Sequence, residues 1–117
     1  MNEFILAYLN MWQNFALFTG RSGRGDYWRV FAVNLAIGFV LGVLSQLLDV
    51  FSWIGSLYSL AALIPGLALA VRRLHDVGKS GLYVLYALIP LVGWIIVLIP
   101  LAQAGDPAEN RFGPVPA

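Results

Sequence analysis

Long apolar runs, separated by short polar clusters, dominate the sequence. Residues 30–48, 50–71 and 82–102 contain no charged side chain and are 19, 22 and 21 residues long. At about 1.5 Å rise per residue, a helix of this length crosses a hydrocarbon core about 30 Å thick. The runs do not alternate between apolar and polar positions, so membrane-spanning β-strands are not indicated. The pattern predicts an all-α membrane protein with about three transmembrane helices in a single domain, residues 1–117.

The third apolar run allows two interpretations. Pro90, Gly93 and Pro100 interrupt it, so residues 82–102 either cross the membrane or enter it and return as a re-entrant hairpin. Irregular backbone in lipid needs cover from protein, which favours the full crossing. A full crossing places the polar tail, residues 103–117, on the side of the membrane opposite the N-terminus, whereas a hairpin leaves it on the same side.

Residues 1–18 predict an amphipathic helix that is too short and too polar to span. One face is expected to be polar, and it carries Glu3, Ala7, Asn10 and Asn14. The other side carries Phe4, Tyr8, Trp12 and Phe15. We expect this helix either to lie in the membrane interface, with its Tyr and Trp at headgroup level, or to pack on the end of the helical bundle.

Small and polar residues recur every three to four positions inside the first two runs. In the first run this face consists of Asn34, Gly38, Gly42 and Gln46. In the second run the matching stripe includes Ser56, Ser59, Ala62 and Gly66. Glycines spaced in this way let helix backbones approach closely. We predict that the first two spans pack through these faces; a dimer face or a polar path is the alternative.

Two polar clusters beside the apolar runs carry most of the charge. Residues 20–29 and 72–81 each contain three basic side chains. Basic residues next to a span favour the cytoplasmic side, so both clusters and the N-terminus are predicted in the cytoplasm. Asp49 then lies outside, at the tip of a tight turn, where it is positioned to cap the helix that follows.

The candidate site comes from these two clusters and consists of Arg21, Arg24, Asp26, Arg72, Arg73, His75, Asp76 and Lys79. Unpaired charges near lipid are costly, and Asp76 follows Arg72 and Arg73 at helical ion-pair spacing. We therefore predict that the clusters meet and that Asp76 pairs with arginines. Asp26 is expected to cap the first span or to bond to an arginine of the other cluster.

The favoured function is binding of anionic lipid headgroups, or of a partner membrane protein or second copy, through this cluster. Topology marking alone also explains the basic residues. The alternative is a small enzyme or transporter for a phosphorylated or lipidic substrate, with His75 and Asp76 as an acid/base pair.

The composition excludes several other classes of protein. Hydrophobic residues make up 60% of the chain and charged residues only 11%, too few to cover a soluble fold. The net charge of +1 does not indicate a nucleic-acid partner. With no cysteine and one histidine, the sequence indicates no metal site and no cofactor.

Three motifs, placed in order around the apolar runs, resemble a known family. They are Phe18-x-Gly20-Arg21-x-x-Arg24-x-x-Tyr27-Trp28, Arg72-Arg73-Leu74-His75-Asp76-x-Gly78-x-Ser80-Gly81 and Gly105-x-x-x-x-Asn110-Arg111-Phe112-Gly113. The chain resembles the domain of unknown function 805 family (YhaH/YhaI-type proteins), and the middle motif is the most specific of the three. The resemblance implies a multi-pass protein of the bacterial inner (plasma) membrane, and it supplies no activity and no catalytic residues. Tyr83 departs from the tryptophan expected near that position.

Overall fold

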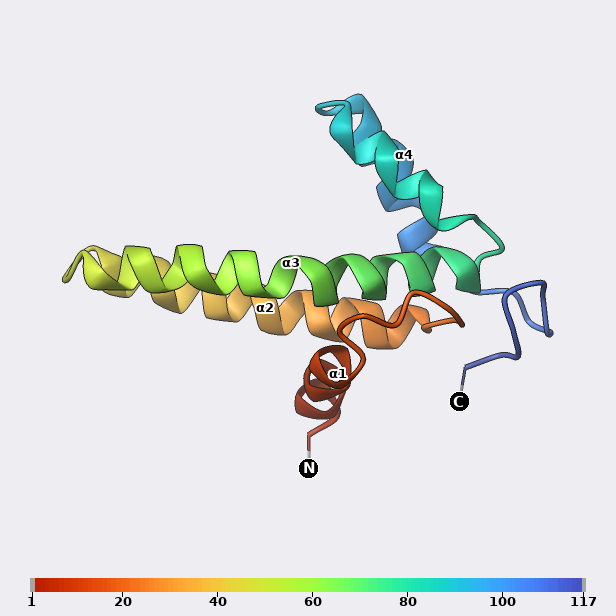
Figure 1. The fold of residues 1–117 in the computed structure, drawn as a ribbon, viewed down its shortest axis with the longest axis horizontal. Coiled ribbons are helices and arrows are strands. Elements are labelled where there is room, and N and C mark those ends of the chain that lie inside the picture. The colour runs from red at the N-terminus through yellow and green to blue at the C-terminus, as the bar shows by residue number, and fades with distance from the viewer. Residues whose placement is uncertain (1, 117) are drawn as a thin grey trace.

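The computed structural model describes residues 2–116, which form helices joined by short loops. In chain order the elements are α1 (Glu3–Gln13), α2 (Arg24–Ser45), α3 (Val50–Asp76), the 3₁₀ helix η1 (Gly81–Leu88) and α4 (Val92–Ala102). Helices α2 and α3 run antiparallel and form a long hairpin (Figure 1). By length and composition alone, these two helices are long and apolar enough to cross a membrane. The predicted all-α class is confirmed for the described residues.

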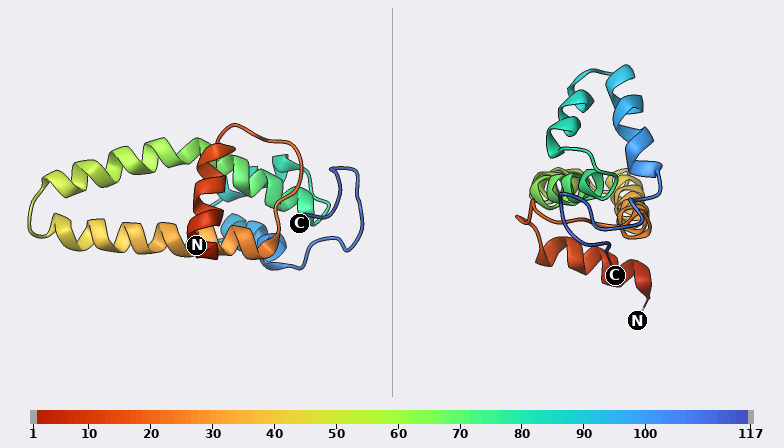
Figure 2. Two further views of the ribbon diagram at one scale, coloured as in Figure 1. Left: turned by 90° about the horizontal axis from the view of Figure 1, so that it is seen from below. Right: turned by 90° about the vertical axis from the view of Figure 1, so that its right-hand side faces the viewer.

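The remaining helices attach to the half of the long hairpin that lies away from its turn. We call the end formed by the start of α2 and the end of α3 the base. Helix α1 extends to one side of the long hairpin, and η1 with α4 extends to the other side (Figures 1 and 2). The tail also lies at the base. The other elements therefore lie toward the base, whereas the α2–α3 turn at the opposite end has no element of the described residues packed against it.

Helix α1 packs across the long hairpin rather than along it (Figure 2). Ala7 and Met11 are buried against residues of α2 and α3. The Tyr8 hydroxyl forms a hydrogen bond with the Tyr58 hydroxyl at 2.8 Å. The helix predicted within residues 1–18 therefore exists and packs on the bundle. It ends earlier than predicted, and Ala7, assigned to the polar face, lies against the bundle instead.

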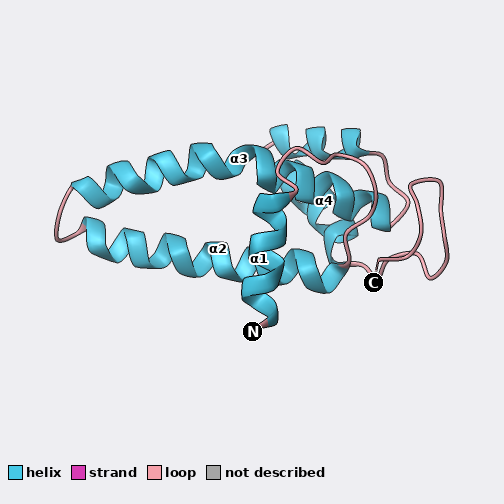
Figure 3. Ribbon diagram, turned by 60° about the horizontal axis from the view of Figure 1, so that its bottom comes forward, coloured by secondary structure: helices cyan, strands magenta, loops and turns pink. Residues whose placement is uncertain are grey.

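The predicted contact between the small-residue stripes is found at Asn34 and not at the glycines. The Tyr58 hydroxyl of α3 donates to Asn34 Oδ1 of α2. The stripes face each other across an open groove of about 740 Å³ between α2 and α3. Among residues 2–116, nothing lies within 4 Å of where a Cβ would stand at Gly38, Gly42 or Gly66. Ser45 and Ser56 donate to carbonyls of their own helices, so their hydroxyl protons are not donated across the groove. The two helices diverge between base and turn, as Figure 3 shows.

Of the two interpretations of residues 82–102, the favoured single helix is wrong, and the chain forms a hairpin of two short arms. The chain forms η1, turns at Leu91 with a positive φ of 62°, and returns as α4 beside η1. Gly93 permits this close return, because a Cβ there would overlap the carbonyl oxygen of Tyr86. Trp94 Nε1 donates to the carbonyl of Ala87 at 3.0 Å and links the two arms. We call residues 81–102 the short hairpin; it begins and ends at the base (Figure 1).

Candidate functional site

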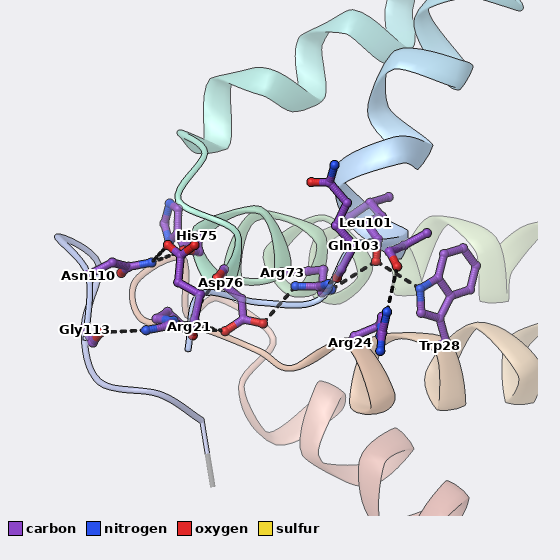
Figure 4. A network of polar contacts seen from close by, with 12 residues as sticks. Arg21, Arg24, Trp28, Arg73, His75, Asp76, Leu101, Gln103, Asn110 and Gly113 are labelled. Atoms are coloured by element: carbon purple, nitrogen blue, oxygen red, sulfur yellow. Dashed lines mark hydrogen bonds and ion pairs between the residues drawn. The ribbon is translucent and has the colours of Figure 1, made fainter. Parts of the chain in front are cut away.

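The two polar clusters meet at the base, as predicted. Asp76, the last residue of α3, pairs with Arg21 from the loop before α2 and with Arg73 from its own helix. Arg21 Nη2 lies 2.9 Å from Asp76 Oδ1, and Arg73 Nη1 lies 2.9 Å from Asp76 Oδ2. Each carboxylate oxygen thus has its own guanidinium partner (Figure 4). Asp76 is 3% exposed and Arg73 is fully buried, so these ion pairs form in the interior of the base.

The tail closes over this pair and completes the cluster. Arg21 donates to the backbone oxygens of Asp106 at 2.7 Å, Ala108 at 2.9 Å and Gly113 at 3.1 Å. Gly105 brings the tail against Asp76, because a Cβ at this position would overlap the carboxylate. The tail and both clusters therefore lie together at one end of the long hairpin, rather than at opposite ends as a full third crossing would place them.

The end of α4 is held by basic residues from both clusters. The last carbonyls of a helix lack partners inside the helix and carry partial negative charge. The Leu101 carbonyl accepts from Arg73 Nε at 3.1 Å and from Trp28 Nε1 at 3.0 Å. Arg24 donates to Ala102, and Arg73 also donates to Gln103. This capping fixes the point at which the short hairpin returns to the base (Figure 4).

Arg72 holds a different part of the base, the loop between α1 and α2. Its guanidinium donates to Ser22 Oγ at 3.0 Å and to the carbonyls of Leu17 at 2.6 Å and Asn14 at 3.2 Å. Within residues 2–116, its Nη2 atom is buried without a hydrogen-bond partner. The predicted helical spacing to Asp76 is thus used by Arg73 and not by Arg72.

His75 and Asp76 do not form an acid/base pair around a common cavity. The His75 ring stacks on Phe112 with the ring centres 4.0 Å apart, and its Nδ1 lies 2.9 Å from the Gly20 carbonyl oxygen. Asn110 donates to the His75 carbonyl at 3.0 Å. Asp76 lines a pocket of about 320 Å³ with other residues, and His75 is not among them. The hypothesis of catalysis by this pair finds no support in the geometry.

The other two predicted aspartate roles are not fulfilled. Asp26 lies in the first turn of α2 and pairs with Arg29 of the same helix at 3.3 Å. It neither caps α2 nor reaches an arginine of the second cluster. Asp49 does stand at the turn of the long hairpin, immediately before α3, but in the described structure its side chain accepts no capping hydrogen bond.

The basic residues of the chain fall into two groups. Arg21, Arg72 and Arg73 have side chains inside the base, and that of Arg21 is 1% exposed. The second group lies at the surface of the base and is called the basic surface: Arg24, Arg29, Lys79 and Arg111. Of the predicted site residues, only Arg24 and Lys79 belong to this surface. The remaining arginines of the prediction hold the protein together.

Sequence analysis did not identify several residues of the site. Arg29 and Arg111 belong to the basic surface, and the tail residues Gly105, Asn110 and Phe112 pack on the cluster. The third family-like motif, in the tail, was the available signal. Its partners were hidden because a full third crossing would have carried the tail away from them.

Comparisons with known proteins identify a family and several relatives. The family model described as "Protein of unknown function (DUF805)" matches residues 15–114, a range that includes every residue of the candidate site. "Inner membrane protein YhaH" of Escherichia coli (strain K12) is 38% identical over 117 residues, which cover 93% of this chain and 94% of that protein. "Inner membrane protein YhaI" of the same strain is 36% identical over 107 residues, or 91% of each chain. No solved structure matches.

Proposed function

The chain belongs to the DUF805 family of proteins of unknown function, and we propose that it is a non-catalytic protein of the bacterial inner membrane that binds anionic lipid headgroups. Its relatives include inner-membrane proteins. Binding takes place at the basic surface, which faces the cytoplasm. The buried cluster around Asp76 gives this end of the molecule its shape. The alternative, a small enzyme, has no comparable support, because both oxygens of Asp76 are already held by guanidinium groups.

The distribution of charge supports the orientation. All seven Lys and Arg residues of the chain lie in the segments that form or adjoin the base: Arg21, Arg24, Arg29, Arg72, Arg73, Lys79 and Arg111. The turn at the other end carries Asp49 and no basic residue. Basic residues beside membrane spans mark the cytoplasmic side. The base, the N-terminus and the tail are therefore cytoplasmic in this proposal, and α2 and α3 cross the membrane.

The observation that carries lipid binding is the separation between buried and exposed basic residues. Arg21 and Arg73 already donate to carboxylate and carbonyl oxygens of the chain, so they have little capacity left for a ligand. Arg24, Lys79 and Arg111 are exposed at the end of the spans, where headgroups lie. A basic side chain near an anionic leaflet contributes about 1 kcal/mol of binding free energy.

Native mass spectrometry of the purified protein tests the proposal. The protein is released from nanodiscs containing phosphatidylethanolamine with phosphatidylglycerol, and the retained lipids are counted. We expect selective retention of phosphatidylglycerol, and a loss of at least about tenfold in Arg24→Gln/Arg29→Gln/Lys79→Gln/Arg111→Gln. A charge-preserving control exchanges Lys and Arg at the same four positions and should retain the lipid. Equal retention by the glutamine variant and the control overturns the proposal.

A further inference from the structure

The short hairpin projects from the base without cover from the rest of the chain (Figure 1). Between Lys79 and Asp106 there is no charged residue. Large hydrophobic side chains along both arms are exposed, among them Leu88 at 79% and Leu91 at 68%. Apart from Gly93, which is buried between the two arms, burial is confined to the part nearer the base, where Val97 and Leu101 pack with Leu74 of α3. Water is a poor solvent for such a surface, so its natural surroundings are lipid.

The length of the arms determines how far the short hairpin can reach. Eight residues of η1, at about 2.0 Å rise per residue, and eleven of α4, at about 1.5 Å, each give an arm of about 16 Å. This is about half of a hydrocarbon core of about 30 Å. Both arms start at the base, and the hairpin leans away from α3 rather than running along it (Figure 1). Its tip therefore reaches the middle of the bilayer at most.

Most backbone N–H groups in the turn of the short hairpin are hydrogen-bonded, which suits the turn to a lipid environment. Unpaired donors in hydrocarbon cost several kcal/mol each, which is the main objection to a hairpin inside a membrane. Here Ile89, Val92 and Gly93 each donate a backbone hydrogen bond within the short hairpin, at 2.7–3.0 Å. Pro90 has no N–H group to satisfy. The turn thus meets most of its hydrogen-bonding needs without a second protein.

The ends of the short hairpin carry the residues expected at a headgroup layer. Lys79 precedes the first arm, and its Nζ lies 5.7 Å from the centre of the Tyr83 ring. Arg24 and Trp28 contact the end of the second arm through its terminal carbonyls. Basic and aromatic side chains are enriched at the membrane–water interface. Both ends of the hairpin therefore lie at one interface.

We propose that the short hairpin is a re-entrant element that inserts among the acyl chains of the cytoplasmic leaflet and ends near the middle of the bilayer. Its partner is the lipid of a single leaflet. The choice of leaflet rests on the orientation given under the proposed function, whereas the half-insertion does not depend on headgroup binding by the basic surface.

Single-cysteine labelling tests this topology, since the natural chain has no cysteine. Leu91→Cys marks the tip of the short hairpin, Leu48→Cys the turn of the long hairpin, and Ala108→Cys the tail. A membrane-impermeant maleimide is applied to spheroplasts and to inside-out vesicles. We expect Leu48→Cys to react only in spheroplasts, Ala108→Cys only in inside-out vesicles, and Leu91→Cys in neither until detergent is added. Leu88→Cys replaces the tip variant if that variant does not fold.

A nitroxide attached to the same tip cysteine measures depth, through its relative accessibility to oxygen and to a water-soluble nickel complex. Leu35→Cys, a lipid-exposed position eleven residues into α2, is the matched control at about 16 Å from the base. The tip label should lie within the hydrocarbon and no deeper than the Leu35 label. Maleimide labelling of Leu91→Cys in spheroplasts would show a full crossing, and labelling in inside-out vesicles would show a hairpin on the surface. Spin coupling between tips, lost on dilution with unlabelled protein, would show burial in a second copy. Each of these three results overturns the proposal.

Discussion

At the scale of single residues, Asp76 forms the central ion pairs of the base. It is the acidic partner of two buried arginines that come from segments far apart in the chain. Removing one partner of a buried ion pair leaves the other charge without compensation, and this costs more than the pair itself contributes. The same carboxylate is also the surface on which Gly105 of the tail packs.

We expect Asp76→Asn to lower the free energy of unfolding by about 3–5 kcal/mol, because Arg21 and Arg73 stay buried and lose their counter-charge. Equilibrium unfolding in detergent micelles with increasing dodecyl sulfate measures the change. The matched control is Asp26→Asn, whose ion pair with Arg29 is half exposed and should cost less than about 1 kcal/mol. Equal losses in the two variants would contradict the role given to Asp76.

Gly105→Ala tests the contact between the tail and the cluster. A methyl group at this position overlaps the Asp76 carboxylate, so we expect a loss of about 1–3 kcal/mol from overpacking. The control is Gly23→Ala, where nothing among the described residues lies within 4 Å of the added Cβ. Thermal unfolding followed by circular dichroism compares the two. A neutral Gly105→Ala would mean that the tail does not press on Asp76 in the membrane.

At the scale of elements, the spacing of the glycines does not predict which of them lie at a close contact. Gly38 and Gly42 form the spacing typical of packed helices, yet they face an open groove. Gly93 belongs to no such pattern, yet α4 passes so close to η1 there that a Cβ would overlap the Tyr86 carbonyl. The spacing of glycines identifies a face of a helix, but it does not say whether a second helix approaches that face.

Gly42→Leu, which the sequence pattern predicts to be disruptive, is therefore expected to leave folding unchanged. Gly93→Ala is expected to separate the arms of the short hairpin, because the added methyl group overlaps the Tyr86 carbonyl. Hydrogen exchange over residues 81–102, read by mass spectrometry in detergent, should rise at least about tenfold in Gly93→Ala and stay unchanged in Gly42→Leu. The opposite pattern would restore the predicted packing of the spans.

At the scale of the whole molecule, the elements other than the two spans are gathered toward the base. Helix α1, the short hairpin and the tail all attach to this half of the long hairpin, while the α2–α3 turn is bare (Figures 1 and 3). In the proposed orientation, the cytoplasmic leaflet holds the short hairpin in addition to α2 and α3. The outer leaflet holds only the two spans, so the protein is wider on its cytoplasmic side.

Reporter fusions at the C-terminus give the overall test of this arrangement. Because the tail is bonded to Arg21 at the base, we expect a C-terminal green fluorescent protein to fluoresce and a C-terminal alkaline phosphatase to be inactive. Fusions within the α2–α3 turn provide the control and should give the reverse result. Phosphatase activity at the C-terminus would instead support a third full crossing.

The sequence alone determined the features that depend on neighbours within a few positions. Uncharged runs of adequate length identified α2 and α3 as helices, because helical hydrogen bonds connect residues only four apart. The spacing of Arg73 and Asp76 likewise predicted their ion pair. Charge counts beside the spans were enough to predict which ends of these helices lie together.

Only the tertiary structure decided which distant segments meet. Arg21 bonds to tail residues 85 to 92 positions away, and no local pattern contains that information. The same holds for the third apolar run, whose length fits one crossing but whose return at Leu91 depends on the fit of Gly93 against Tyr86. Periodicity fixes the face that a helix presents, since the backbone geometry is local. What that face contacts depends on the fold of the whole chain. A buried arginine is stable only where distant segments of the folded chain supply its hydrogen-bond acceptors and counter-charge.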